Sequence, residues 1–106
     1  YDGTLSSRFS RAKTTMTAKK YGWTLTFGEY ADLVAQPCEY CRMPNTTDQG
    51  KGLDRLENKK GYHLDNVVSC CPECNMVRND IFTPEEMRST LGPAVRVVKI
   101  ARGQSL

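Results

Sequence analysis

The sequence predicts a single small α+β domain, with short strands at its centre and helices on either side. The chain has 106 residues, which suits one domain. Its ends have apolar residues at helical spacing, whereas its centre has short β-branched runs between turn signals. Only 39% of the residues are hydrophobic, and the five cysteines indicate that a metal ion or disulfides supplement a modest core. We divide the chain into a basic helical region (1–36), a cysteine-bearing core (37–80) and a C-terminal helix and tail (81–106).

The N-terminal region begins with an amphipathic helix. Apolar side chains recur there at steps of four, three and four residues, at Leu5, Phe9, Ala12 and Met16. That spacing predicts a helix over residues 4–20 that ends before Gly22. Most basic residues of this segment fall on its other faces, so we expect a basic outer surface made by Arg8, Arg11, Lys13, Lys19 and Lys20.

A short extended piece and a second helix follow. Large apolar residues alternate with threonine over residues 23–27, which is typical of extended backbone. Thr26 and Glu29 have the spacing of a capping box, which predicts the start of a helix. We expect that helix to end at Pro37 and to bury three apolar side chains, those of Tyr30, Leu33 and Val34.

The central region predicts a loop, two strands and a helix. Residues 42–52 are rich in turn-forming residues and predict a loop. The candidate strands are Gly52 to Leu56 and Val67 to Cys70, and the turn signal Asn-Lys-Lys-Gly lies between them at residues 58–61. From Pro72 onward the sequence fits a helix that begins at the second cysteine pair.

The C-terminal region predicts one helix with a clear start. Thr83 has the position of its cap, Pro84 its first helical position and Glu86 the third. Gly92 and Pro93 together predict that this helix stops there. Residues 94–101 fit either a strand or a helix.

Two Cys-x-x-Cys pairs give the strongest chemical signal in the chain. Each pair can place two thiolates around one metal ion, and two pairs complete a tetrahedral zinc site. The second pair falls at a predicted helix start, where the helix dipole stabilises thiolate charge. We therefore expect a structural Zn²⁺ ion that staples the fold, with Cys38, Cys41, Cys71 and Cys74 as its ligands. Four thiolates leave no open position for catalysis, so any chemistry lies elsewhere.

Two alternatives involve the same cysteines. Two disulfides in a secreted domain would use four of them, but no secretory signal is visible and the fifth cysteine is left over. Cys70 precedes Cys71 in a predicted strand, so its side chain points to the opposite face. We interpret Cys70 as a small buried hydrophobe. The alternative is that Cys70 replaces Cys71 as a zinc ligand.

The distribution of charge suits a polyanionic partner. The formal net charge is +3, and the two flanking regions each have an excess of two basic residues around a centre of −1. A solvated helix face gives the same pattern. No apolar run approaches the roughly twenty residues of a transmembrane helix, so we expect no such span.

The segment from Gly52 to Asn75 resembles a known family when it is taken together with the first cysteine pair, Cys-Glu-Tyr-Cys. The segment is Gly-Leu-Asp-Arg-Leu-Glu-Asn-Lys-Lys-Gly-Tyr-His-Leu-Asp-Asn-Val-Val-Ser-Cys-Cys-Pro-Glu-Cys-Asn. It looks like an HNH endonuclease of the four-cysteine zinc kind, and most of all like small phage and bacterial members with a Leu-Asp-Arg motif. The resemblance covers residues 38–80.

This resemblance implies a ββα-metal fold, of the treble-clef-like, His-Me finger type. Two strands and a helix would hold one catalytic Mg²⁺ or Mn²⁺ ion beside the structural zinc. Asp54 would bind that cation from the first strand and Asn75 from the start of the helix. Asn66 would hydrogen-bond the loop and maintain the geometry of the site. A hard cation with few protein oxygens and several waters is what Mg²⁺ prefers.

One position departs from the family pattern. The family has a histidine directly after the strand aspartate, as the general base that activates water, and this chain has Arg55 there. Arginine keeps its proton, so Arg55 is instead a candidate phosphate ligand. His63, the single histidine, is a candidate base or phosphate ligand or simply an exposed loop residue. Glu57, Asp80 and metal-bound hydroxide are the other candidate bases.

The resemblance implies double-stranded DNA as the partner and an intracellular location in a bacterium or a phage-infected host. We expect phosphate contacts from Arg8, Arg11, Lys13, Lys59, Lys60 and Arg78. The first hypothesis is a metal-dependent DNA endonuclease. The second, which Arg55 motivates, is a nuclease-derived DNA-binding module without cleavage. The third is a zinc-stapled protein-interaction domain.

Overall fold

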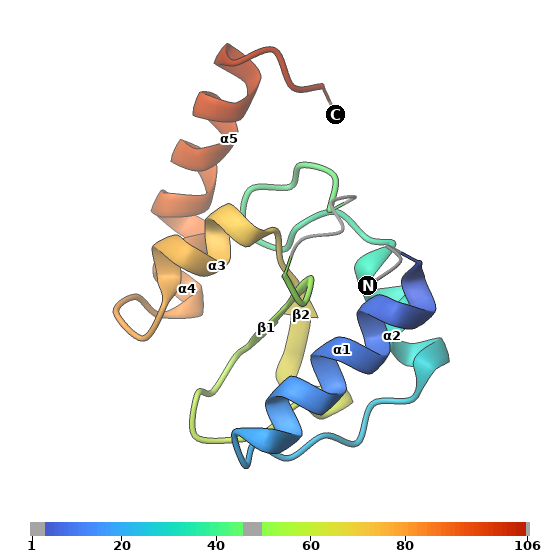
Figure 1. Ribbon diagram of the computed structural model, residues 1–106. Coiled ribbons are helices and arrows are strands. Elements are labelled where there is room, and N and C mark those ends of the chain that lie inside the picture. Colours follow the sequence, from blue (N-terminus) through green and yellow to red (C-terminus); the bar gives the residue numbers. More distant parts are fainter. Residues whose placement is uncertain (1–3, 46–49, 106) are drawn as a thin grey trace.

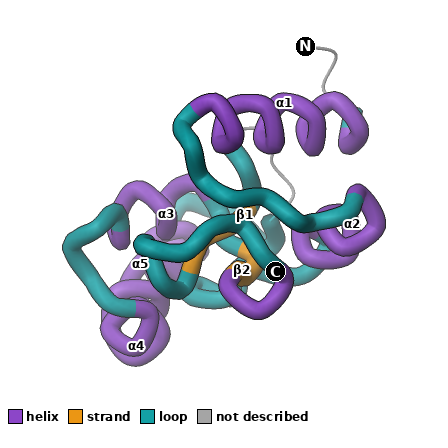
Figure 2. Tube along the Cα trace, turned by 90° about the horizontal axis from the view of Figure 1, so that it is seen from below, coloured by secondary structure: helices purple, strands orange, loops and turns teal. Residues whose placement is uncertain are grey.

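The computed structural model describes residues 4–45 and 50–105. Its elements in chain order are α1 (Leu5–Ala18), α2 (Phe27–Val34), β1 (Leu53–Arg55), a 3₁₀ turn (Leu64–Asn66), β2 (Val67–Ser69), α3 (Pro72–Arg78), α4 (Pro84–Glu86), a π-helical segment (Met87–Leu91) and α5 (Gly92–Ala101). The hairpin lies at the centre, with α1 and α2 on one side and α3 to α5 on the other (Figures 1 and 2). The predicted small α+β class with flanking helices is confirmed. Part of the predicted 42–52 loop, residues 46–49, lies outside the described residues.

Local side-chain caps set where the helices begin. The Thr4 hydroxyl accepts a hydrogen bond from the Ser7 amide at the start of α1, at 3.1 Å. Thr26 and Glu29 form the predicted capping box at α2, with each side chain bonded to the other residue's backbone amide. These caps need only residues three apart, which is why the sequence predicted them.

The first helix differs from its prediction on one face. Ala12 and Met16 are buried as expected, whereas Leu5 is 39% exposed. Arg8, predicted on the basic outer surface, is buried at 7% exposure, and its Nε donates to the Gly50 carbonyl at 3.2 Å. A long arginine can bury its stem and still satisfy its head group on a backbone carbonyl, so its charge alone did not reveal the buried face.

The two strands form an antiparallel hairpin that pairs Asp54 with Val68. Leu53 belongs to one apolar cluster, which the first two helices cover; its buried members are Met16, Leu25, Tyr30, Val34, Leu53, Tyr62 and Val67. A second cluster surrounds the cysteines and includes Tyr40, Met43 and Met87. The hairpin therefore joins two separate small cores. Among the described residues, no helix is long and apolar enough to cross a membrane.

The C-terminal helix does not stop at Gly92 and Pro93, so that prediction was wrong. Helical backbone runs from Pro84 to Ala101, with a π-helical segment, Met87–Leu91, directly before Pro93. A proline inside a regular helix lacks one amide donor and clashes with the preceding turn. A π-helical turn changes the hydrogen-bond pattern there, so the helix continues as α5. This also resolves residues 94–101 as helix.

Gly92 is required by close packing rather than by its backbone angles. A Cβ atom built at Gly92 would lie 2.2 Å from the Tyr40 carbonyl oxygen. We expect Gly92→Ala to destabilise the fold by about 1–3 kcal/mol, as overpacking does. The control is Gly28→Ala in α2, where the nearest atom to the added Cβ is 4.0 Å away. Chemical denaturation should show Gly28→Ala neutral or more stable; equal effects of the two changes would contradict the packing argument.

Candidate metal centre and active site

Four cysteine side chains converge at one point between the hairpin and α3. The Sγ atoms of Cys38, Cys41, Cys71 and Cys74 all lie within 4.8 Å of one another, and all four residues are buried. All five cysteines are free thiols, so the disulfide alternative is not realised. Cys70 lies outside the set of four, is buried at 1% exposure, and directs its thiol to the Cys71 carbonyl at 3.4 Å. The predicted ligand set is therefore assembled, and Cys70 is the buried hydrophobe.

The thiols of this cluster oppose one another's ionisation. The pKa of Cys38 is lowered, chiefly by a hydrogen bond with Cys41, whereas the pKa of Cys74 is raised, chiefly by its hydrogen bond with Cys38. The Cys38 thiolate is thus stabilised by thiols that include Cys71 and Cys74, whose pKa values are raised. All four ionise together only when a cation neutralises them, which fits a closed zinc site of four thiolates.

A buried lysine from α5 completes the surroundings of this centre. The Lys99 ammonium lies 3.1 Å from Cys71 Sγ and 3.7 Å from Cys41 Sγ. It also forms an ion pair with Glu73 at 2.9 Å, while its own side chain is only 7% exposed. Burial opposes its charge, but Glu73 and Cys71 raise the pKa of Lys99 overall. Lys99 was not predicted as a site residue, because nothing local relates it to cysteines 28 and 58 positions away.

We expect Lys99→Met to weaken zinc retention. Methionine fills a similar volume but leaves the four thiolates without their neighbouring cation, a loss of about 2 kcal/mol for a charged hydrogen bond. Zinc release to a chromogenic chelator should accelerate, and the melting temperature should fall. Arg102→Met, which removes an exposed charge at the end of the same helix, is the control. Identical zinc release from the two variants would contradict a role for Lys99 at the centre.

The second candidate site is a cavity of about 230 Å³ beside β1. Asp54 lines it and is paired with Arg78, whose Nη1 donates to both carboxylate oxygens at 2.9 and 2.7 Å. The Tyr40 hydroxyl donates to Asp54 Oδ2 at 2.6 Å. The two charged side chains are 8% and 4% exposed, so this is a buried ion pair. Burial raises the pKa of the Asp54 carboxyl, and the hydrogen bonds from Tyr40 and Arg78 oppose that rise.

Arg78 holds the walls of this cavity together. Its guanidinium also donates to the carbonyls of Arg55, Leu56 and Phe82, at 2.6, 3.0 and 3.0 Å. The residue is 3% exposed. The prediction that Arg78 contacts DNA phosphate does not fit this burial. It instead fixes Asp54 relative to the end of β1 and the loop after α3.

The two asparagines of the motif make different contacts. Asn66 is buried, accepts a hydrogen bond from the Glu57 amide at 3.0 Å, and donates to the carbonyls of Glu57 and Gly61 at 3.1 and 3.0 Å. These are the loop hydrogen bonds that the resemblance implied. Asn75, on α3, lines the cavity, and its amide nitrogen donates to the Leu53 carbonyl at 3.1 Å.

Asp54 and Asn75 line one cavity with oxygen atoms of the kind that a hard cation prefers. The Asn75 amide nitrogen is bound to backbone, which leaves its oxygen as the acceptor. Asp54 Oδ1 accepts one hydrogen bond and Oδ2 accepts two, so one lone pair remains, on Oδ1. One carboxylate and one amide, completed by water and phosphate, match Mg²⁺. Because Arg78 already neutralises Asp54, we expect a low affinity for the cation in the absence of DNA.

The three candidate bases, His63, Glu57 and Asp80, differ in their position relative to the Asp54 cavity. His63 is not among the residues that line the cavity; its Nδ1 is 2.7 Å from the Thr24 hydroxyl, and its ring packs near Gly22. Glu57 is exposed and forms an ion pair with Lys60 at 3.2 Å. Asp80 does line the cavity, where it accepts a hydrogen bond from Asn58 at 2.6 Å. Of these three, Asp80 is the residue that the fold brings to Asp54.

Arg55 lies in the cavity wall but is already engaged. Its guanidinium carbon is 3.9 Å from the centre of the Tyr21 ring and 5.3 Å from that of Tyr62. Its Nη1 donates to two loop carbonyls, those of Asn58 and Lys60. Burial raises the pKa of Tyr62 to about 12, so this tyrosine stays protonated. Sequence reasoning missed several residues that line the cavity, for which no motif signalled a role: Tyr21, Lys51, Tyr62 and Asn79. It also missed Tyr40, whose hydroxyl binds Asp54.

The remaining predicted DNA contacts are on the surface. Arg11, Lys13, Lys59 and Lys60 are exposed, and Arg8 and Arg78 are the two that are buried. Lys19, which lines the cavity, is also exposed. The basic surface beside the site is therefore smaller than the sequence predicted.

The fold matches that of a solved nuclease. No model of a known protein family matches the chain. Its structure superposes on the rare-cutting HNH restriction endonuclease PacI with a TM-score of 0.78, over 96% of this chain and 83% of that one, at 22% sequence identity. The chain has the fold of an HNH endonuclease. This match confirms the predicted fold resemblance.

A viral protein shows similarity in sequence. The chain is 36% identical over 83 residues to the uncharacterized protein R423 of Acanthamoeba polyphaga mimivirus. The aligned region covers 76% of this chain but about 15% of that protein. The HNH-fold chain thus corresponds to a small part of a much longer relative.

Proposed function

We propose that this chain is a metal-dependent DNA endonuclease that hydrolyses phosphodiester bonds in double-stranded DNA. The observation that supports this most is the cavity beside β1. Within an HNH fold, it brings together Asp54 from the first strand, Asn75 from α3 and a second carboxylate, Asp80. These are the groups that hydrolysis of a phosphodiester requires: cation ligands and a proton acceptor.

Each residue of the site has a separate role in hydrolysis. Asp54 and Asn75 hold the cation, and Arg78 and Tyr40 hold the Asp54 carboxylate in place. Asn66 fixes the loop that leads into β2. Asp80 accepts the proton of the attacking water, because it is the candidate base that lines the cavity. Bound Mg²⁺ or Mn²⁺ would supply positive charge to the phosphate and to the leaving oxygen.

The main contribution to DNA affinity comes from basic side chains that contact phosphates, rather than from contacts with the bases. Four basic residues are exposed and do not line the Asp54 cavity: Arg11, Lys13, Lys59 and Lys60. Their side chains are suited to contact phosphates on either side of the site. Such contacts give an affinity that falls steeply with salt.

The test is cleavage of supercoiled plasmid DNA by the purified, zinc-loaded protein. We expect nicked or linear DNA with added Mg²⁺ or Mn²⁺, and none when these ions are omitted. Omission is preferable to a chelator, because a chelator would also remove the structural zinc. Cleavage without any added cation would contradict the assignment of Asp54 and Asn75 as its ligands.

A DNA-binding module without cleavage is the second candidate. One observation favours it: both oxygens of Asp54 are bound by Arg78, and His63 lies outside the cavity lining. This function predicts salt-dependent binding to plasmid DNA with no strand cleavage at any concentration of Mg²⁺ or Mn²⁺.

A further inference from the structure

Lys51 has an anchored backbone, but its ammonium group has no bonded partner among the described residues. It lies between two glycines with positive φ, Gly50 at 70° and Gly52 at 77°. A Cβ atom at Gly52 would approach Arg8 and Val34 to 2.8 Å, so this turn is both left-handed and tightly packed.

Every carbonyl of this turn is bound by a distant residue. Arg8 donates to the Gly50 oxygen at 3.2 Å, and the Tyr30 hydroxyl donates to the Lys51 oxygen at 2.7 Å. The Gly52 oxygen accepts from the Asn45 side chain and from the Cys70 amide, both at 2.9 Å. The backbone that presents the Lys51 side chain is therefore tied to α1, to α2 and to the strand that leads to the zinc centre.

The ammonium group of Lys51 has no such anchoring. Within residues 4–45 and 50–105, no hydrogen bond or ion pair reaches it, and the residue is half-buried. Burial lowers the pKa of Lys51, and the charge of Asp54 opposes that effect. A half-buried cation without a bound partner costs stability until an anion neutralises it.

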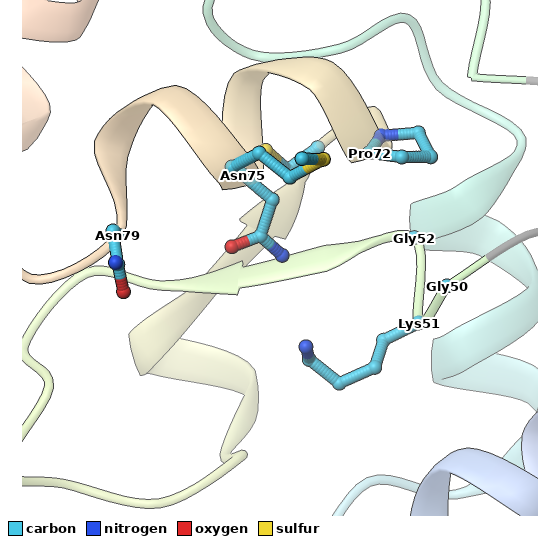
Figure 3. Close-up of a pocket in the computed structure, with 8 residues that line it drawn as sticks. Gly50, Lys51, Gly52, Pro72, Asn75 and Asn79 are labelled. Carbon is cyan, nitrogen blue, oxygen red and sulfur yellow. The ribbon is translucent and has the colours of Figure 1, made fainter.

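The position of Lys51 indicates which anion. Lys51 lines the cavity of Asp54, and it also lines a neighbouring cavity of about 470 Å³. Asn75 and Asn79 line both as well. Figure 3 shows the Lys51 side chain leaving the Gly50–Gly52 turn and running back along β1, with the amide of Asn75 directed into the same space.

The other cations of the Asp54 cavity are less available. Arg78 forms an ion pair with Asp54. Arg55 donates hydrogen bonds to two carbonyls and packs against two aromatic rings. Lys19 lines the cavity but is exposed at the end of α1. Lys51 thus differs from these three cations, because it is half-buried, its backbone is anchored, and no described residue neutralises its charge.

We propose that Lys51 is a catalytic residue whose ammonium binds a non-bridging oxygen of the scissile phosphate that Asp54 and Asn75 face. This rests on the proposed nuclease function. The phosphate is the anion that the half-buried charge lacks, and the anchored turn fixes the backbone from which the Lys51 side chain extends. Fixed positive charge at a reacting phosphate lowers the barrier in the same way as a preorganised oxyanion site.

The test compares Lys51→Met with Lys51→Arg and with Arg102→Met, which removes one exposed charge from the end of α5. Plasmid cleavage with Mg²⁺ is measured first. We expect Lys51→Met to lose about a hundredfold in kcat, Lys51→Arg to recover part of that loss, and Arg102→Met to cleave like the unmodified protein. Zinc content and circular dichroism establish that each variant is folded. Should Lys51→Met fail to fold, Lys51→Arg, Lys51→Gln and the salt dependence below carry the comparison.

The second readout is DNA binding without added Mg²⁺ as a function of salt. Loss of one phosphate contact reduces the slope of log affinity against log salt by about 1. We expect that reduction for Lys51→Met and not for Lys51→Arg. An unmodified protein that cleaves DNA together with a Lys51→Met variant of unchanged kcat and slope would overturn this inference and leave the nuclease function standing. Conversely, a protein that binds without cleaving, and whose slope falls with Lys51→Met, would overturn the nuclease function while supporting Lys51 as the phosphate ligand.

Discussion

Asp54→Asn is expected to abolish metal-dependent DNA cleavage while zinc stays bound and the fold is kept. The amide has the shape of the carboxylate, and its single oxygen, in the place of Oδ2, still accepts hydrogen bonds from Tyr40 and Arg78. The buried Arg78 therefore keeps an acceptor there, although the side chain has lost the charge that binds a cation. Changes to residues that merely support a metal ligand cost 10–100-fold, so loss of the ligand charge should exceed about a hundredfold. Plasmid cleavage with Mg²⁺ and zinc content are the two measurements.

Asp54→Ala is a poorer test of catalysis, for a reason that the structure supplies. Unlike the asparagine variant, it leaves Arg78, at 4% side-chain exposure, with neither a carboxylate nor an amide oxygen at this position. Removing one partner of a buried ion pair costs about 3–5 kcal/mol, so this variant should be unstable as well as inactive. Full activity of Asp54→Asn would show that the catalytic cation is held elsewhere.

Cys74→Ser is expected to lose zinc and unfold. Cys74 is fully buried and belongs to the cluster of four thiols. Structural zinc sites contribute about 10–16 kcal/mol of apparent binding free energy, whereas a small domain has only about 5–15 kcal/mol of stability in total. Zinc analysis and far-ultraviolet circular dichroism measure the two effects directly.

The matched control is Cys70→Ser, four positions earlier and equally buried at 1% exposure. Its thiol interacts with Cys38 but is not one of the four that converge. It also lies near the Cys71 carbonyl, which a serine hydroxyl can use as an acceptor. We expect this variant to bind one equivalent of zinc and to remain folded. A folded, zinc-free Cys74→Ser protein would remove the argument that zinc staples this fold.

Sequence reasoning succeeded where the determining contacts are local. The capping boxes at Thr26 and Thr83 depend on residues three positions apart. The Cys-x-x-Cys spacing places two thiols on one turn, so the four ligands were identified without coordinates. Asn66 bonds to a loop that ends five residues earlier, at Gly61. In each case the chain itself keeps the partners close.

Sequence reasoning failed where a long side chain finds a distant partner. Arg8 and Arg78 were assigned to DNA because they are basic, yet they bind acceptors 42 and 24 residues away inside the protein. The Gly92-Pro93 pair was taken as a stop, yet a π-helical segment and contact with Tyr40 let the helix continue.

The sequence by itself predicted the class of fold and the four cysteines that converge, because these follow from spacing and residue chemistry. It indicated the Asp54–Asn75 pair only through the family resemblance. Only the tertiary structure decided which charges are free to meet a ligand. It neutralised Asp54 with Arg78, placed Lys99 against the thiols, directed His63 to Thr24 and left Lys51 without a partner among the described residues. The physical reason is that a charged side chain is satisfied by whatever the fold places beside it, and that neighbour is set by packing across the whole chain.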